Sequence, residues 1–122
     1  MNFRPLVSLV CPTYGRPQLI PFAVQFFLSQ TWTRSELIII DDSPRDLQCK
    51  IRESGRIRVV RLKDRLSLGE KHNLGHDLAQ GDILGYQDDD DIWGHHRLAR
   101  QLQPIVLGEC SIVGMLRDVV FK

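Results

Sequence analysis

The stretch ELIIIDDS, residues 36–43, is an apolar run that ends abruptly in two acidic residues and a serine. Unbroken apolar runs rich in isoleucine are typical of strands buried on both faces of a parallel sheet. A second stretch of similar design, DILGYQDDDD at residues 82–91, ends in four carboxylates. Because parallel sheets bind ligands at the carboxyl ends of their strands, the two stretches together predict a sheet with an acidic, ligand-binding edge.

The segments around these stretches alternate between strand and helix patterns. Strand-like apolar runs occupy residues 6–11, which Pro12 is expected to stop, and residues 57–62, where interspersed basic residues suit a sheet edge. We predict helices from residue 20 to 29 or 30 and over residues 45–53, 68–80 and 95–107, and further short strands over residues 111–115 and 119–121. This order predicts an α/β fold, an open and mainly parallel sheet with helices on both faces.

The composition is that of an ordinary globular domain. With 122 residues, 43% hydrophobic and 25% charged, the chain fits one domain over residues 1–122. Its 16 basic and 15 acidic residues nearly cancel, which argues against a nucleic-acid partner. No apolar run approaches the roughly 18 residues of a transmembrane segment. Since Cys11, Cys49 and Cys110 match no zinc pattern, we expect reduced thiols in a cytoplasmic protein, at most peripheral to the inner face of the membrane.

The acidic run Asp88, Asp89, Asp90 and Asp91 follows its strand directly. Adjacent carboxylates repel one another strongly in a low dielectric, so the run is costly unless a cation or water relieves it. Mg²⁺ and Mn²⁺ prefer oxygen ligands and keep positions open for substrate phosphates. A site for such an ion and a diphosphate is the interpretation that we favour, and a solvated acidic turn is the alternative.

Two further strand ends carry polar groups. Asp42 can accept a hydrogen bond from a ribose hydroxyl or from the imide N–H of a pyrimidine, although a helix cap by Asp42 or Ser43 is an alternative. After the first strand, the loop with Tyr14 and Arg16 offers an aromatic face and a cation. The helix that begins near residue 68 adds free N–H groups and Lys71, which suit an anion.

Other patterns are weaker or missing. There is no lysine-serine pair of the P-loop kind and no G-x-G-x-x-G after the first strand, so those phosphate sites are not expected. His95 and His96 are adjacent, and neighbouring side chains on a helix point apart. We therefore predict that both histidines lie on the surface and bind no metal.

The motifs together resemble the family 2 glycosyltransferases of the GT-A fold. The stretches that carry the resemblance follow in the family's order and spacing across nearly the whole chain: PTYGRPQLIPFAVQFFLSQT at 12–31, ELIIIDDS at 36–43 and LGEKHNLGHDLAQGDILGYQDDDDIW at 68–93. The resemblance implies the Rossmann-like, nucleotide-diphospho-sugar-binding half of a GT-A domain. It also implies that Pro12, Thr13 and Tyr14 line the base pocket, that Asp42 bonds a uracil-type imide, and that Lys71 lies near the base or the diphosphate.

On the metal side, the resemblance identifies Asp88 to Asp90 with the family's D-x-D motif. It implies that Asp89 contacts the ribose and that Asp90 binds Mn²⁺ or Mg²⁺, with Asp88 and Arg16 on the substrate side of the site. The implied activity is metal-dependent transfer of a sugar from a nucleoside diphosphate sugar, a UDP-sugar first of all, to a saccharide or lipid-linked acceptor, with inversion at the anomeric carbon.

The resemblance also implies a second half. In the family, the acceptor pocket and the catalytic base lie there, so we expect the base beyond Lys122 and a domain truncated before that half. We also expect self-association of this fragment through the apolar residues of its final strands. The alternatives left open are a sugar-1-phosphate nucleotidyltransferase and a non-catalytic nucleotide-binding module.

Overall fold

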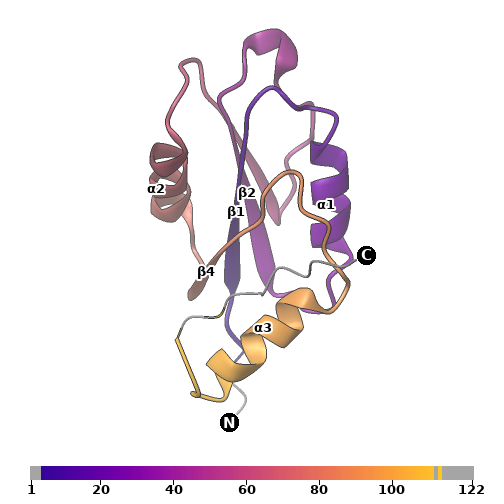
Figure 1. Cartoon of the computed structure of the whole chain (residues 1–122), viewed down its shortest axis with the longest axis vertical. Coiled ribbons are helices and arrows are strands. Elements are labelled where there is room, and N and C mark those ends of the chain that lie inside the picture. The colour runs from indigo at the N-terminus through magenta and orange to yellow at the C-terminus, as the bar shows by residue number, and fades with distance from the viewer. Residues whose placement is uncertain (1–3, 112, 114–122) are drawn as a thin grey trace, which may run out of the picture.

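The computed structural model describes residues 4–111 and residue 113. Its centre is a four-stranded parallel sheet, whose place between the helices can be followed in Figure 1. The strand order is β3-β2-β1-β4, and each neighbouring pair is parallel. The elements follow in the order β1 (Val7–Thr13), α1 (Ile20–Leu28), β2 (Ser35–Asp41), the 3₁₀ helix η1 (Arg45–Leu47), β3 (Ile57–Arg61), α2 (Leu68–Leu78), β4 (Ile83–Tyr86) and α3 (Arg97–Val106). The predicted open α/β sheet is confirmed, and β3 lies at a sheet edge as expected.

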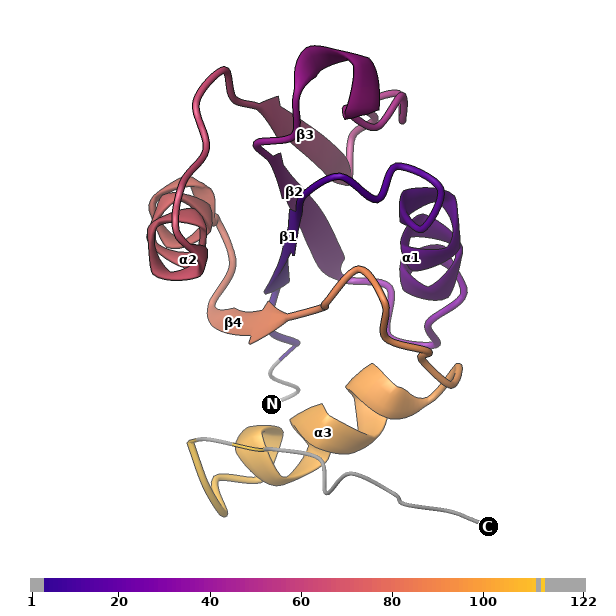
Figure 2. The ribbon, with the colours of Figure 1, turned by 45° about the horizontal axis from the view of Figure 1, so that its top comes forward.

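Helices cover both faces of the sheet, as Figure 2 shows for α1 and α2. On one face, Leu9 and Ile39 of the strands pack with Phe27 of α1 and with Leu98 and Leu102 of α3. On the other face, the strand residues Val10, Ile38 and Ile40 pack with Leu74 and Leu78 of α2. Because side chains alternate along a strand, the unbroken apolar runs supply both cores at once.

Strand β1 extends past the proline that was expected to stop it. Val7 N donates to Arg34 O on the β2 side, whereas Val10 O accepts from Gln87 N on the β4 side. Backbone groups alternate sides along a parallel strand, so Pro12 faces the β4 side. The pairing with β4 ends at Val10 and Tyr86, while the pairing with β2 continues to Thr13. The missing N–H of Pro12 therefore costs no ladder hydrogen bond, and the strand reaches Thr13.

The helix predicted over residues 45–53 is wrong, because only η1 forms there. The backbone of this segment finds partners far along the chain instead of within a helical turn. Cys49 N donates to Asp41 Oδ2 at 2.7 Å, and the Arg61 guanidinium donates to Cys49 O and Ile51 O. Gln48 is already extended, with ψ at 145°. These contacts hold an irregular loop along the side of β3.

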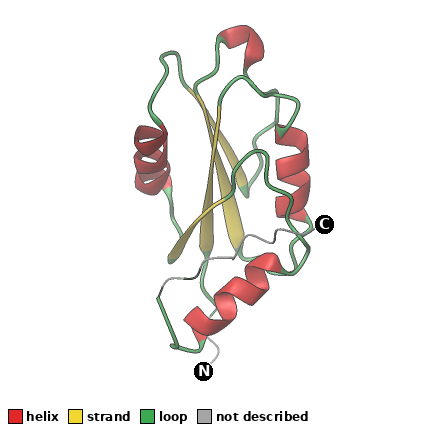
Figure 3. Ribbon diagram, in the orientation of Figure 1, coloured by secondary structure: helices red, strands yellow, loops and turns green. Residues whose placement is uncertain are grey.

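The other helices form where the pattern predicts them, with shorter ends. Helix α1 carries Pro21 in its first turn, and α2 begins with a capping box between Ser67 and Glu70. The strands predicted over 111–115 and 119–121 lie outside the described residues, apart from Ser111 and Val113. Among the described residues, no helix is both long enough and apolar enough to cross a membrane. Figure 3 shows how the helices flank the twisted sheet.

Two glycines of α2 provide a test of its packing on β1. A Cβ at Gly75 would lie 2.7 Å from Val10 Cγ2 and closer still to Cγ1, whereas a Cβ at Gly69 meets nothing within 4 Å. Gly75→Ala should therefore lower the free energy of unfolding by about 2–3 kcal/mol through overpacking. Gly69→Ala should raise it by about 0.5 kcal/mol, since alanine is the better helix former. Urea denaturation measures both, and equal effects of the two substitutions would contradict this packing.

Candidate functional site

Three loops meet at the carboxyl edge of the sheet. They follow β1, β2 and β4, and β1 lies between the other two strands. Because the strands are parallel, their loops leave the sheet in the same direction. The structure thereby brings together the aromatic and basic loop after β1, the acidic pair after β2 and the acidic run after β4. This is the juxtaposition that the sequence predicts.

Asp42 and Lys71 form a buried ion pair in this edge. Their residues are 2% and 6% exposed, and Lys71 Nζ lies 2.6 Å from Asp42 Oδ1. Asp42 Oδ2 accepts a hydrogen bond from Leu66 N at 2.7 Å. Among the described residues, Oδ1 has the ammonium as a charge partner but no well-oriented hydrogen bond. The pair thus balances the buried charge and leaves Oδ1 able to accept a hydrogen bond.

The local capping role belongs to Asp41, the other member of the acidic pair. Its Oδ1 accepts from Ser43 N at 3.0 Å and its Oδ2 accepts from Cys49 N at 2.7 Å. Pro44 occupies the cap position of η1, which has no side-chain cap. The alternative in which Asp42 or Ser43 caps a helix is therefore wrong. Ser43 Oγ instead accepts from Gly15 N at 2.7 Å, which joins the loops after β2 and β1.

Tyr14 lies half-buried beside this ion pair. The guanidinium carbon of Arg65 is 3.9 Å from the centre of the Tyr14 ring, and Lys71 Nζ is 5.7 Å from it. Arg65 comes from the loop between β3 and α2, and Leu66 N ties that loop to Asp42. Arg65 could not be predicted from the sequence, because nothing in its neighbourhood distinguishes it from other exposed basic residues.

Asp89 is the buried member of the acidic run, at 4% exposed. Its Oδ2 accepts from Thr13 Oγ1 at 2.8 Å, and its Oδ1 lies 2.6 Å from Arg16 Nη2. Asp89 therefore clamps the loop after β1 to the loop after β4. The ribose contact that the resemblance implies for Asp89 stays a prediction, and in this structure both oxygens already have partners.

The other three acids form an oxygen cluster. One carboxylate oxygen from each of Asp88, Asp90 and Asp91 lies within 4.8 Å of the other two. Burial, and then the negative charges of Asp91, Asp90 and Asp89, raise the pKa of Asp88 above its ordinary value, against an opposing effect of His72. Negative charge is in excess at this cluster, and carboxylate oxygens are the ligands that Mg²⁺ and Mn²⁺ prefer. The residues present fit such an ion.

Gln87 fixes the start of the acidic run, a role that the sequence analysis missed. It is fully buried, its N donates to Val10 O at 3.0 Å, and its Nε2 donates to Ala23 O at 2.8 Å. An amide directly between a strand and a run of acids was the only signal for it. Pro12 is buried beneath the same edge, whereas His95 and His96 are exposed, as predicted.

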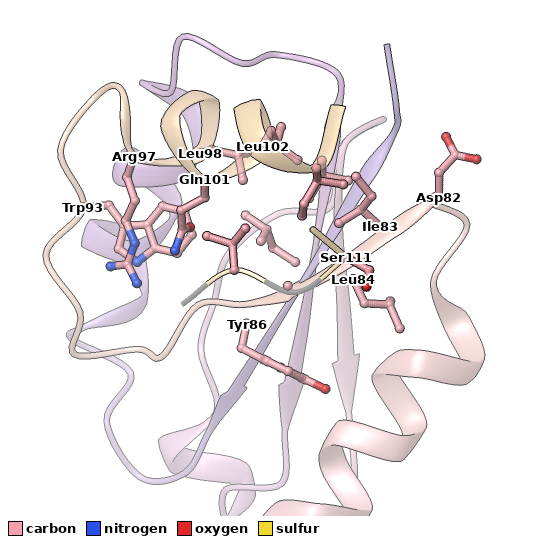
Figure 4. Close-up of a pocket in the computed structure, with 15 residues that line it drawn as sticks. Asp82, Ile83, Leu84, Tyr86, Trp93, Arg97, Leu98, Gln101, Leu102 and Ser111 are labelled. Atoms are coloured by element: carbon pink, nitrogen blue, oxygen red, sulfur yellow. The ribbon is translucent and has the colours of Figure 1, made fainter. Parts of the chain in front are cut away.

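A separate hollow of about 570 Å³ lies between α3 and β4 (Figure 4). Its lining is mostly apolar, with Leu9, Ile83, Leu98 and Leu102 among the residues, and with Asp82 and Arg97 at different ends. None of the residues at the acidic edge lines it. The hollow is therefore separate from the charged groups at the carboxyl edge.

Comparison with known proteins agrees with this geometry. The model of the family described as "Glycosyl transferase family 2" matches residues 8–122, and the chain belongs to this family. Among curated relatives, the glycosyltransferase TuaG of Bacillus subtilis (strain 168), named for teichuronic acid biosynthesis, is 31% identical over 115 residues. The match covers 90% of this chain and 46% of TuaG, so the chain spans less than half of that relative's length.

Solved structures of glycosyltransferases share the fold. The mannosyltransferase PcManGT from Pyrobaculum calidifontis, solved in complex with GDP-Man and Mn²⁺, matches with a TM-score of 0.62 at 21% identity, over 75% of this chain and 29% of that one. TarS residues 1–349 of S. aureus, solved in complex with UDP, matches with a TM-score of 0.65 at 20% identity, over 81% and 31%. The fold is therefore the Rossmann-like α/β fold of the GT-A glycosyltransferases.

The buried ion pair can be tested by a double-mutant cycle. Lys71→Met should cost about 3–5 kcal/mol of stability, because it leaves the Asp42 charge buried without its partner. Adding Asp42→Asn to that variant should recover most of the loss, because the buried charge is removed while Leu66 N keeps an acceptor. Guanidinium denaturation of the wild type, both single variants and the double variant measures the coupling. Additive costs would rule out the pair.

Proposed function

We propose that this chain binds the donor of a glycosyltransferase that moves a sugar from a nucleoside diphosphate sugar, with UDP as the nucleotide, to a saccharide or lipid-linked acceptor. One observation carries the proposal. The buried Asp42 carboxylate, whose Oδ1 contacts Lys71 but has no well-oriented hydrogen bond, lies beside Tyr14 on the same sheet edge as the oxygen cluster of Asp88, Asp90 and Asp91. Asp42 and Tyr14 can bind a nucleotide base, and the oxygen cluster can bind a cation together with a diphosphate.

Base recognition rests on the loops after β1 and β2. Asp42 Oδ1 accepts the imide N–H of uracil, a charge-assisted bond that is strong where water is excluded. The half-buried Tyr14 ring offers a face on which a flat heterocycle stacks. Pro12 and Thr13 lie buried at the end of β1, next to Tyr14 in the chain. Lys71 balances the charge of Asp42, and we place it near the base or the diphosphate.

Phosphate and metal binding rest on the loop after β4. Asp90, with Asp88 and Asp91, would hold Mn²⁺ or Mg²⁺, whose charge, when bound, stabilises the departing diphosphate. Arg16 is the nearby cation that can contact phosphate oxygens. Support for a divalent ion comes from the Mn²⁺ complex of PcManGT, and support for UDP comes from the complex of TarS.

The groups that bind and activate the acceptor are proposed to lie outside residues 1–122. From the family resemblance, we place the acceptor pocket and the base that deprotonates the acceptor hydroxyl beyond residue 122; the match covers 46% of TuaG. Residues 1–122 then form the nucleotide-sugar-binding part of a larger GT-A domain. We propose inversion at the anomeric carbon on the family resemblance alone. A lipid-linked acceptor would place the enzyme at the inner face of the membrane.

Asp90→Asn tests the metal. The substitution removes a charged ligand, so UDP binding in the presence of Mn²⁺ should weaken by at least about 1.4 kcal/mol, which is tenfold. Asp77→Asn on the exposed side of α2 is the matched control and should bind like the wild type. Calorimetry with Mn²⁺ and with EDTA measures the effect. Equal affinity of the wild type for UDP under both conditions would exclude a metal-assisted site.

Asp42→Ala tests base recognition. It should cost about 1.5–3 kcal/mol of UDP affinity, the range for a lost hydrogen bond to a charged group, and leave Mn²⁺ binding intact. Asp42→Asn adds a sharper comparison, because its amide can donate to the ring nitrogen that cytosine leaves unprotonated. The ratio of UDP to CDP affinity should fall in that variant. Normal UDP binding by both variants would show that Asp42 does not read the base.

A further inference from the structure

The Arg16 guanidinium contacts two carboxylates that have different surroundings. Its Nη2 lies 2.6 Å from Asp89 Oδ1, and its Nη1 lies 3.7 Å from Asp90 Oδ2. The Asp89 side chain is 1% exposed, whereas that of Asp90 is 59% exposed and that of Arg16 is 48% exposed. One contact is therefore short and shielded, and the other is long and open to water.

We propose that Arg16 is an exchangeable counter-cation of the metal site. Before a divalent ion binds, Arg16 neutralises part of the charge on Asp90. When the ion and the diphosphate bind, Arg16 leaves Asp90, keeps its bond to Asp89, and turns its free N–H groups to the diphosphate. This assigns a positioning role to Arg16 and rests on the proposed function for the identity of the ion and the phosphate.

The fixed end of this arrangement is Asp89. Its second oxygen is held by Thr13 Oγ1 at 2.8 Å, so the carboxylate is restrained from both sides. Removing Arg16 from Asp89 would leave a buried charge without its partner, which is costly. The guanidinium is thus kept within reach of the acidic cluster in either state. Gly15, with φ at 68°, forms the turn that places Arg16 opposite the loop after β4.

The exchangeable end is the contact with Asp90. Ion pairs that are exposed to water contribute little, since solvent screens them and side-chain entropy opposes them. A divalent ion interacts with the same carboxylate through twice the charge, so it displaces the guanidinium readily. Guanidinium groups match phosphate oxygens in geometry and bind them through paired hydrogen bonds. Arg16 therefore opposes a bare ion but favours an ion that carries a diphosphate.

This role predicts effects of opposite sign, which a merely structural role would not produce. Arg16→Gln should tighten the binding of Mn²⁺ alone about fivefold, because a positive charge beside the cluster is lost. The same variant should bind UDP at saturating Mn²⁺ about tenfold more weakly, because a charged contact to the diphosphate is lost. Arg16→Lys keeps the charge, so its affinity for Mn²⁺ alone should match the wild type, while its UDP affinity falls.

The experiment is a titration with Mn²⁺ followed by electron paramagnetic resonance of the free ion, with and without UDP. The proteins are the wild type, Arg16→Gln, Arg16→Lys and the control Arg100→Gln, which removes a positive charge from the exposed side of α3. The control should change neither affinity. If circular dichroism shows that Arg16→Gln is unfolded, Arg16→Lys tests the proposal by itself. Unchanged Mn²⁺ affinity together with weakened UDP binding in that variant would support it.

Two results would overturn the proposal for Arg16: weaker binding of Mn²⁺ alone by Arg16→Gln, or UDP affinities of both Arg16 variants equal to the wild type. A different result would overturn the proposed function itself. That result is a wild-type protein that binds UDP equally with Mn²⁺ and with EDTA, whatever the Arg16 variants do.

Discussion

The parallel pairing of β1 with both β2 and β4 is the constraint on which the site depends. It places the loop after β1 between the two acidic loops. Thr13 and Arg16 can then bind Asp89 on one side, while Gly15 binds Ser43 on the other. The cores on both faces of the sheet fix this central strand, so the three loops are positioned by rigid elements.

Charge balance at this edge differs from one carboxylate to the next. Lys71 balances Asp42 within the protein, and Arg16 balances Asp89. Among the described residues, the one ion pair of the cluster of Asp88, Asp90 and Asp91 is the long, exposed contact between Arg16 and Asp90, and burial together with mutual repulsion raises the pKa of Asp88. Negative charge is therefore balanced within the protein at Asp42, where we propose that the nucleotide base binds. It is not balanced at the acidic cluster, where we propose that the diphosphate binds. A divalent ion, which we propose for this cluster, would supply the missing positive charge.

Local patterns predicted the fold because the apolar runs, such as residues 36–40, are unambiguous and the helices between them are amphipathic. They also placed Asp42 and residues 88–91 at strand ends, which brings them together once the sheet is parallel. What they missed depends on distant partners. Arg61 donates to the carbonyl groups of Cys49 and Ile51, which holds this segment in a loop instead of a helix. Strand β1 can include Pro12 because its pairing with β4 ends at Val10, so no hydrogen bond to β4 is lost. Likewise, Asp41 and Asp42 look equivalent in sequence, and only their tertiary partners distinguish them. Asp41 accepts hydrogen bonds from the backbone of its own loop, whereas Asp42 pairs with Lys71.

We propose that one cation and one nucleotide bind together across the loops after β1, β2 and β4. The most direct measurement is the broadening of backbone amide signals by substoichiometric Mn²⁺ in the presence of UDP, recorded by nuclear magnetic resonance. We expect the strongest broadening at residues 88–91 and 13–16, and we expect Mg²⁺ and UDP to shift the signals of Tyr14, Asp42 and Leu66. Broadening that is as strong around Asp46 or Asp77 as at residues 88–91 would contradict it.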